Sequence, residues 1–290
     1  MKIGLLASEI KQRANTDDLF EAIKKYGFES TQLSFSAIPE LNFQSTGQIE
    51  FPERIDDKII SVIGAGAKRH GVEISVCSGT FNMAHPDREV REEGIKRLEA
   101  LAHTAKKLNT KFISLCAGTR CRESLWVYHP ENSTPGAWAD MMVTMKKCVE
   151  IAERHDIILA VETEAATVVD TPEKARRMMD EIGSGNLKMI MDCANLFHSG
   201  EAKKENVQRT IARAFEIFGD DVVIAHGKDI ANSDGIRFCP TGEGIVDYRQ
   251  FIELLKKHNY KGDMLLHGIY DESKLPYARK TIQKAMIDGE

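Results

Sequence analysis

The sequence predicts an α/β fold of the closed parallel type, a (β/α)8 or TIM barrel built from eight strand–helix units. Short apolar runs alternate with longer amphipathic stretches along the whole chain, which is typical of a parallel sheet covered by helices. Eight such units fit into the 290 residues, near the usual size of this barrel. An open doubly wound sheet is the alternative, but residues 7–10, after the first strand, carry no glycine-rich phosphate motif.

The first half of the chain contains four predicted strands, namely 3–7, 31–36, 73–77 and 111–116. Helices with apolar residues at helical spacing are expected between them, over 16–26, 52–70 and 87–108. The inner face of the second helix is expected to carry Ile55, Ile59, Val62, Ile63 and Gly66. Gly71 is expected to end that helix.

A long irregular stretch, 118–135, follows the fourth strand and contains Arg120, Arg122, Trp126 and His129. Long loops in compact domains tend to be functional or disordered, and the aromatic residues here favour a functional loop that covers the site. Thr134 followed by proline predicts the start of the next helix. The methionine stripe of that helix is interpreted as core packing.

The second half contains four predicted strands, 157–164, 187–192, 222–226 and 264–267, each followed by a loop and a helix. The helices are expected to begin at Thr171, at Asn206, near Tyr248 and near Leu275, and residues 228–244 are expected to be a loop. No linker or low-complexity tract interrupts the pattern, so one domain is expected over residues 1–290.

Each of these four strands ends in a residue that can bind a metal. The four are Glu162, Asp192, His226 and His267. In a barrel the C-terminal strand ends surround one axis, so these side chains are expected to meet there. A buried strand should not end in unpaired charge, which is costly. Two carboxylates and two imidazoles suit a divalent ion such as Mn, Co, Mg or Zn. Taken singly, Asp192 could instead cap a turn, and His226 could be a hydrogen-bonded core histidine.

Short motifs near the strand ends resemble those of a known family. They are VETE (161–164), DCANLF (192–197), AHGKD (225–229), TGEGIVDY (241–248), FNMAHPD (81–87) and WVYHPEN (126–132). With them the chain resembles the sugar phosphate isomerase/epimerase family of xylose-isomerase-like TIM barrels over nearly its whole length. The resemblance implies a divalent ion, Mn before Mg, Co or Zn, held by Glu162, Asp192 and His226. His267 stands where the family has a second glutamate.

This departure bears on the reaction that the resemblance implies. The family's 3-epimerases use two glutamates on opposite faces of the sugar, whereas a metal-bound neutral imidazole has no lone pair left to act as a base. The implied activity is proton abstraction alpha to the carbonyl of a keto sugar or polyol derivative, through a metal-stabilised ene-diolate. Isomerisation or epimerisation would follow. The alternative is a lyase or dehydratase that eliminates a beta oxygen substituent from a keto sugar or keto-glycoside.

The resemblance also implies roles for side chains around the metal. The candidate catalytic residues are Glu162, His129 and His267. The candidate substrate-binding residues are His85, Trp126, Glu164, Asn195, Lys228 and Arg237. Asn195 stands where the family has a histidine three residues after the metal aspartate, and His198 follows six residues after it. Lys228 and Asp229 are expected either to hold substrate oxygens or, for Asp229, to form a surface ion pair.

Composition argues against several other classes of protein. The net charge of −5 and the absence of a Lys/Arg-rich loop disfavour nucleic acid as a partner, and with it a three-zinc apurinic endonuclease on the same barrel. A non-catalytic sugar-binding barrel would not need the metal ligands. The six cysteines form no C-x-x-C pair and suggest a reducing cytoplasm. No apolar stretch reaches the roughly 20 residues of a membrane span. The expected partner is a small-molecule sugar, and a homo-oligomer remains open.

Overall fold

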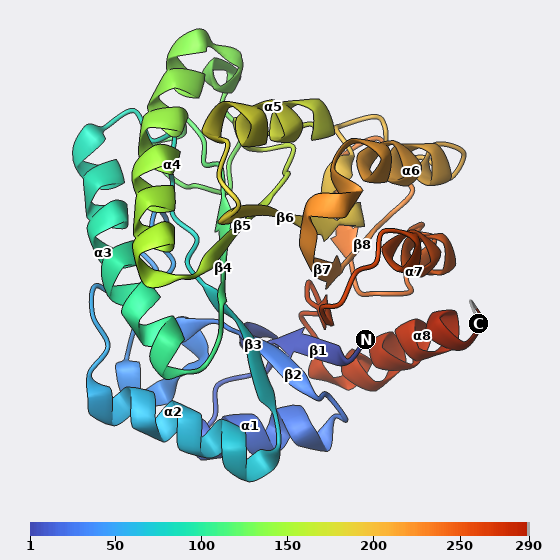
Figure 1. The fold of residues 1–290 in the computed structure, drawn as a ribbon. Coiled ribbons are helices and arrows are strands. Elements are labelled where there is room, and N and C mark those ends of the chain that lie inside the picture. Colours follow the sequence, from blue (N-terminus) through green and yellow to red (C-terminus); the bar gives the residue numbers. More distant parts are fainter. Residues whose placement is uncertain (289–290) are drawn as a thin grey trace.

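The chain forms a closed barrel of eight parallel strands in a computed structural model that describes residues 1–288 (Figure 1). The strands follow the order β1-β10-β7-β6-β5-β4-β3-β2 around the ring. Their bounds are β1 Ile3–Leu6, β2 Ser30–Leu33, β3 Glu73–Ser78, β4 Phe112–Cys116, β5 Ile158–Glu162, β6 Leu187–Asp192, β7 Val222–Gly227 and β10 Met264–Leu266. The predicted (β/α)8 barrel is therefore confirmed.

Eight helices surround the strands in the described part of the chain (Figure 1). They are α1 Thr16–Lys25, α2 Asp57–His70, α3 Arg88–Lys107, α4 Pro135–His155, α5 Pro172–Ile182, α6 Val207–Phe218, α7 Tyr248–Lys257 and α8 Leu275–Asp288. Thr134 caps α4 by accepting a hydrogen bond from the backbone N–H of Ala137, and Pro135 occupies the first helical position, as predicted. Within residues 1–288, none of these helices is both long and apolar enough to cross a membrane.

The predicted start of the second helix at residue 52 is wrong, because α2 begins at Asp57. Phe51 and Ile55 precede the helix and already fill the core in an irregular segment. The helix buries Ile60, Ile63, Gly66 and Ala67, whereas Val62, which was predicted to face inward, is 37% exposed. With Ile55 outside the helix, the buried face is rotated from the predicted stripe toward Ile60 and Ala67.

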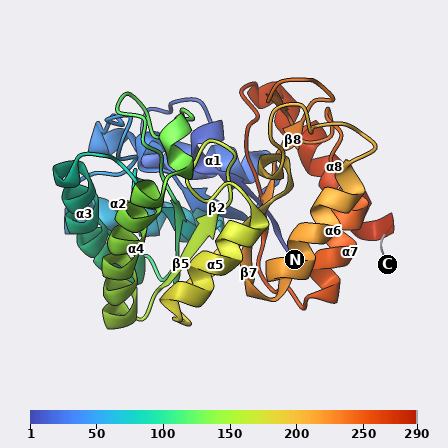
Figure 2. The same ribbon diagram turned by 90° about the horizontal axis from the view of Figure 1, so that it is seen from above.

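The loops also differ from the predicted boundaries. β2 ends at Leu33, and residues 35–37 form a turn of 3-10 helix rather than the end of a strand. The predicted loop 228–244 contains a short antiparallel hairpin of β8 (Asp229–Ile230) and β9 (Phe238–Cys239). In the view of Figure 2, β8 lies at one end of the barrel.

Alternate residues along the strands divide the barrel interior into two layers. The lower layer is an apolar floor formed by Val76, Ala160, Ile190, Ile224 and Leu265, each at most 2% exposed. Since strand side chains alternate between two faces, the residues two positions further along point to the same side. Those residues are polar: Ser78, Glu162, Asp192, His226 and His267. The C-terminal strand ends thus present a ring of polar side chains above an apolar floor.

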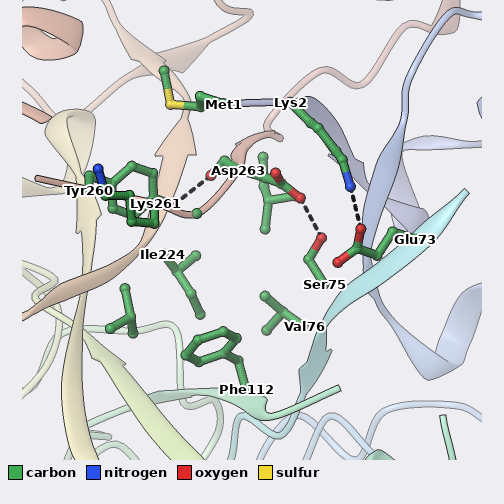
Figure 3. Close-up of a pocket in the computed structure, with 13 residues that line it drawn as sticks. Met1, Lys2, Glu73, Ser75, Val76, Phe112, Ile224, Tyr260, Lys261 and Asp263 are labelled. Carbon is green, nitrogen blue, oxygen red and sulfur yellow. Dashed lines mark hydrogen bonds and ion pairs between the residues drawn. The ribbon is translucent and has the colours of Figure 1, made fainter. Parts of the chain in front are cut away.

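The opposite end of the barrel holds a separate cavity of about 320 Å³, lined in part by the first residues of β3 and β4 and by the segment before β10. Figure 3 shows two polar contacts there: Lys2 meets Glu73, and the Ser75 hydroxyl donates to Asp263 over 2.7 Å. In TIM-barrel enzymes the chemistry lies at the C-terminal strand ends. The two contacts join β3 to the segments before β1 and β10.

Two contacts outside the polar ring join segments that lie far apart or pack closely in the barrel. Gly94 in α3 lies against the Phe81 ring, where an added Cβ would come within 2.1 Å of a ring carbon. Glu272, after β10, accepts hydrogen bonds from the Lys11 backbone N–H and, over 2.9 Å, from the Arg13 guanidinium. This carboxylate therefore ties the β1–α1 segment to the chain after the last barrel strand.

Candidate metal centre

Four side chains from consecutive barrel strands converge above the apolar floor. Glu162 ends β5, Asp192 ends β6, His226 lies in β7 and His267 directly follows β10. Each can offer one ligand atom, and these four atoms lie within 4.8 Å of one another. Two carboxylate oxygens and two imidazole nitrogens at this spacing fit a single divalent ion.

The state of the His226 ring follows from its partner Gln32. His226 Nε2 lies 2.9 Å from Gln32 Oε1, while the Gln32 amide nitrogen donates to the hydroxyls of Ser78 and Ser114. An amide oxygen only accepts, so Nε2 carries the proton and Nδ1 keeps a lone pair. Nδ1 is buried, has no hydrogen-bond partner among the described residues and lies 3.6 Å from Glu162 Oε1. A metal ligand supported through its other ring nitrogen has this arrangement.

Burial fixes the charge of both imidazoles. It lowers the pKa of His226 to about 4. Burial, together with the nearby Lys228 charge, also lowers the pKa of His267, although a hydrogen bond with Asp192 opposes this. His267 Nε2 lies 2.9 Å from Asp192 Oδ2. Both rings are therefore neutral near pH 7, as metal binding requires.

Lys228 and Asn195 connect the carboxylates of the centre. The Lys228 ammonium lies 3.2 Å from Asp192 Oδ2 and donates to Asn195 Oδ1 over 2.6 Å. The Asn195 amide nitrogen donates to Glu162 Oε1, also over 2.6 Å. The Lys228 ammonium lies 4.0 Å from the centroid of the Phe238 ring in β9. The Lys228 ammonium thus contacts Asp192 directly and Glu162 through Asn195.

The pKa values of the two carboxylates, Asp192 and Glu162, shift in opposite directions. Burial raises the pKa of Asp192, but Lys228 and the hydrogen bond with His267 outweigh burial and hold it below its ordinary value. Burial, followed by the charge of Asp192, raises the pKa of Glu162. Burial would lower the pKa of Lys228, yet the neighbouring carboxylates raise it, so the amine is protonated. Burial also raises the pKa of Glu164 to about 7.

The polar ring opens into a chamber of about 490 Å³. Glu162, His226 and His267 line it together with Lys228 and Glu164. The Glu164 carboxylate forms no side-chain hydrogen bond with another described residue. Trp126, from the long loop between β4 and α4, also lines the chamber and is 49% exposed. The structure thus brings most of the predicted site residues into one cavity.

Three predicted site residues are neither among the four candidate ligands nor among the residues that line this chamber. His85 is buried, and its Nδ1 accepts the backbone N–H of Asp87 at the start of α3. The His129 ring accepts the backbone N–H of Glu131 and so caps a short 3-10 helix at residues 130–133. Arg237 is exposed, in the hairpin just before β9. The observed contacts of both histidines are structural.

Asp229 was expected to bind substrate or to form a surface ion pair, and the structure gives it a different role. It is buried, and its carboxylate accepts backbone N–H groups of Ile230, Gly242 and Val246 over 2.9 Å each. These bonds organise the segment between β7 and α7. This segment includes the strand that carries Phe238.

Sequence reasoning missed Gln32, Ser78 and Ser114, the hydrogen-bonded group behind His226. A usable signal exists for the two serines, because each lies two residues after an apolar residue that faces the barrel interior, Val76 and Phe112. The four candidate metal ligands show the same spacing. No comparable signal marks Gln32, since β2 is polar at Ser30, Thr31 and Gln32.

Comparison with known proteins agrees with this geometry. The family profile described as "Xylose isomerase-like TIM barrel" matches residues 20–286. An inosose dehydratase of Glaesserella parasuis is 22% identical over 145 residues, which are 46% of this chain and 48% of that protein. The chain thus spans about half the length of this relative.

Epimerases are also among the similar proteins. The L-ribulose-5-phosphate 3-epimerase UlaE of Escherichia coli is 25% identical over 200 residues, covering 68% of this chain and 64% of that protein. The solved structure of 3-keto-D-glucoside 4-epimerase YcjR from E. coli superposes with a TM-score of 0.72 at 18% identity. It covers 99% of each chain and shows the shared fold.

Proposed function

Because the chain belongs to the xylose isomerase-like TIM barrel family, we propose that it is a divalent-metal-dependent sugar isomerase or epimerase. Its substrate would be a keto sugar or polyol derivative, and the first step would be removal of a proton alpha to the carbonyl. The similarity to epimerases and to inosose dehydratases supports chemistry of this kind.

One observation carries the proposal: the four ligand atoms of Glu162, Asp192, His226 and His267 lie within 4.8 Å of one another at the mouth of the barrel. With Asp192 ionised and both imidazoles neutral, these ligands favour a divalent cation. We propose Mn, while Mg, Co and Zn accept similar donors. When bound, such an ion supplies Lewis-acid activation of a carbonyl group.

Lys228 is assigned to bind a substrate oxygen. Its ammonium is buried, charged and lines the chamber beside Asp192. A fixed cation in a site shielded from water stabilises negative charge that develops on oxygen far better than a solvated one. Asn195 holds the ammonium on one side, and Phe238 covers it on another.

Glu164 is assigned to remove the proton. It lies two residues after Glu162, lines the same chamber and has no side-chain hydrogen bond to another described residue. A base must be within reach of substrate and free to accept a proton, and this carboxylate meets both conditions. His129, one of the three catalytic candidates predicted from the sequence, caps a short 3-10 helix.

The alternative is a lyase that acts through the same first step. His267 replaces the second glutamate expected from the family resemblance, so only one glutamate remains among the four proposed metal ligands. A site with a single base can expel a beta oxygen substituent after proton removal, without returning the proton from the opposite face. The dehydratase relatives make this the second candidate.

The test is incubation of the Mn-loaded protein with a panel of ketoses, keto-inositols and 3-keto-glucosides in deuterated water, followed by NMR. We expect exchange or loss of the proton alpha to the carbonyl, and a fall of about 10²- to 10⁴-fold in Glu164→Gln. Glu173→Gln, on the outer surface of α5, is the matched control. Epimerised products support the first function, and unsaturated products support the lyase.

Metal content is measured on the same preparations. Asp192→Asn should lower the Mn bound per chain in elemental analysis while the barrel stays folded. The proposal fails if no substrate of the panel exchanges its alpha proton, or if Asp192→Asn retains the full metal content.

A further inference from the structure

A second cavity of about 590 Å³ adjoins the metal chamber. Its walls come from four loops at the C-terminal strand ends: Trp126 and Tyr128 after β4, residues 164–170 after β5, residues 195–199 after β6, and Ile236 and Phe238 in the hairpin after β7. His198, six residues after the metal aspartate, lies in this second cavity rather than among the metal ligands.

The two cavities share a boundary. Trp126, Glu164, Asn195 and Phe238 line both of them. A molecule held in the metal chamber can therefore extend past these side chains into the second cavity. The metal chamber alone lies within the usual volume range of small-ligand sites, so the second cavity offers room for a further substituent.

The walls of the second cavity select for an apolar group. Tyr128 is 57% exposed, Trp126 49% and Ile236 39%. Large apolar side chains gathered at one exposed place mark a binding surface more often than scattered ones. Aromatic walls suit a planar ring, which can stack against them or meet their edges.

The charged residues of the second cavity disfavour a phosphate group on the substrate. The residues that line the second cavity include no lysine or arginine, while Glu164 and Asp170 contribute carboxylates. A sugar phosphate directed into this cavity would find no lysine or arginine in its walls, and the ammonium beside Asp170, that of Lys174, is already paired with that carboxylate over 2.7 Å. The substituent that fits is uncharged.

We propose that the second cavity binds an aromatic ring attached to the sugar, which makes aryl derivatives of keto sugars, such as aryl glycosides, the substrate class. This inference rests on the proposed function for the sugar end of the molecule. The sugar ring lies in the metal chamber, and the aryl group passes between Trp126 and Phe238.

Trp126 provides a direct readout, since the chain has only two tryptophans. The other, Trp138 in α4, lies under the Arg177 guanidinium at 4.1 Å and donates to Glu181. Trp138→Phe leaves Trp126 as the single reporter at the boundary of the two cavities. Its emission is titrated with phenyl β-D-glucoside and with methyl β-D-glucoside, which lack a keto group and are not turned over.

We expect phenyl glucoside to change Trp126 emission and to bind at least about tenfold more tightly than methyl glucoside. Tyr128→Ala with Ile236→Ala should remove most of that preference. Val143→Ala, an exposed aliphatic position on α4, should keep it. Equal affinities, no binding of either glucoside, or a preference that survives the double substitution would overturn the proposal.

The wild-type protein separates the two proposals, and the same titration in Asp192→Asn should keep the phenyl preference because Asp192 does not line the second cavity. A phenyl preference in a Mn-loaded wild type that exchanges no alpha proton with any substrate of the panel would leave the aryl site standing and reject the proposed function. Alpha-proton exchange by a protein with no phenyl preference would do the reverse.

Discussion

Replacing Gln32 with leucine should weaken metal binding without removing a ligand. Gln32 Oε1 is the acceptor that keeps the proton of His226 on Nε2 and leaves Nδ1 free. Leucine offers no acceptor, so the ring can take the other tautomer or rotate. Loss of such a supporting hydrogen bond costs about 10- to 100-fold in metal affinity, or roughly 1.4 to 2.8 kcal/mol.

The assay is titration of metal-free protein with Mn²⁺ and Zn²⁺ by calorimetry, or by competition with a chelator of known affinity. Gln32→Glu keeps an acceptor at this place and should bind at least as tightly as the wild type. Gln208→Leu, on the outer surface of α6, is the matched control. A long-range ¹H–¹⁵N spectrum of the metal-free wild type should show His226 protonated at Nε2.

Leucine at position 32 also removes the hydrogen bonds from Gln32 to the hydroxyls of Ser78 and Ser114. The free energy of unfolding should therefore fall by about 1 to 3 kcal/mol. Urea unfolding of the metal-free proteins measures this effect separately from affinity. Wild-type metal affinity in a folded Gln32→Leu protein would refute the role given to Gln32, and so would a His226 ring protonated at Nδ1.

Three further outcomes are expected. Gly94→Ala should destabilise the barrel by about 1 to 3 kcal/mol in urea unfolding, because its Cβ would overlap the aromatic ring against which Gly94 packs, whereas Gly64→Ala, in a roomier place on α2, should be neutral or stabilising. Burial raises the pKa of Glu272, but hydrogen bonds, led by that of Arg13, hold it below its ordinary 4.5. The contribution of this carboxylate to stability is therefore complete above pH 4.5 and is lost as the pH falls through the lowered pKa. The difference in unfolding free energy between the wild type and Glu272→Gln should therefore shrink in acid and not in base. His267→Glu should raise C3 epimerisation with deuterium incorporation, and an unchanged product pattern would count against the role assigned to that position.

The barrel and the four candidate metal ligands could be predicted because the alternation of strands and helices along the chain agrees with the two-residue periodicity within the strands. Each ligand follows an apolar residue two positions earlier on the same face of its strand, as Ile190 precedes Asp192 and Ile224 precedes His226. Parallel barrel geometry then brings the strand ends together without further information.

Contacts set by tertiary structure could not be predicted in the same way. Gln32 meets a histidine 194 residues away along the chain, and no local pattern indicates which polar residue of β2 faces inward. The start of α2 was missed because Ile55 fits a helical stripe equally well, although it fills the core from an irregular segment. Asp229 resembled a substrate ligand, yet it serves the backbone of its own loop.

The apolar floor of the barrel has a consequence for how molecules enter and leave. Val76, Ala160, Ile190, Ile224 and Leu265 close the interior below the metal centre. Water and ions in the cavity at the opposite end of the barrel therefore have no direct path to the four candidate metal ligands. Reactant and product must pass through the same opening, one after the other. Product that lingers there excludes the next reactant, so inhibition by product should be competitive with substrate.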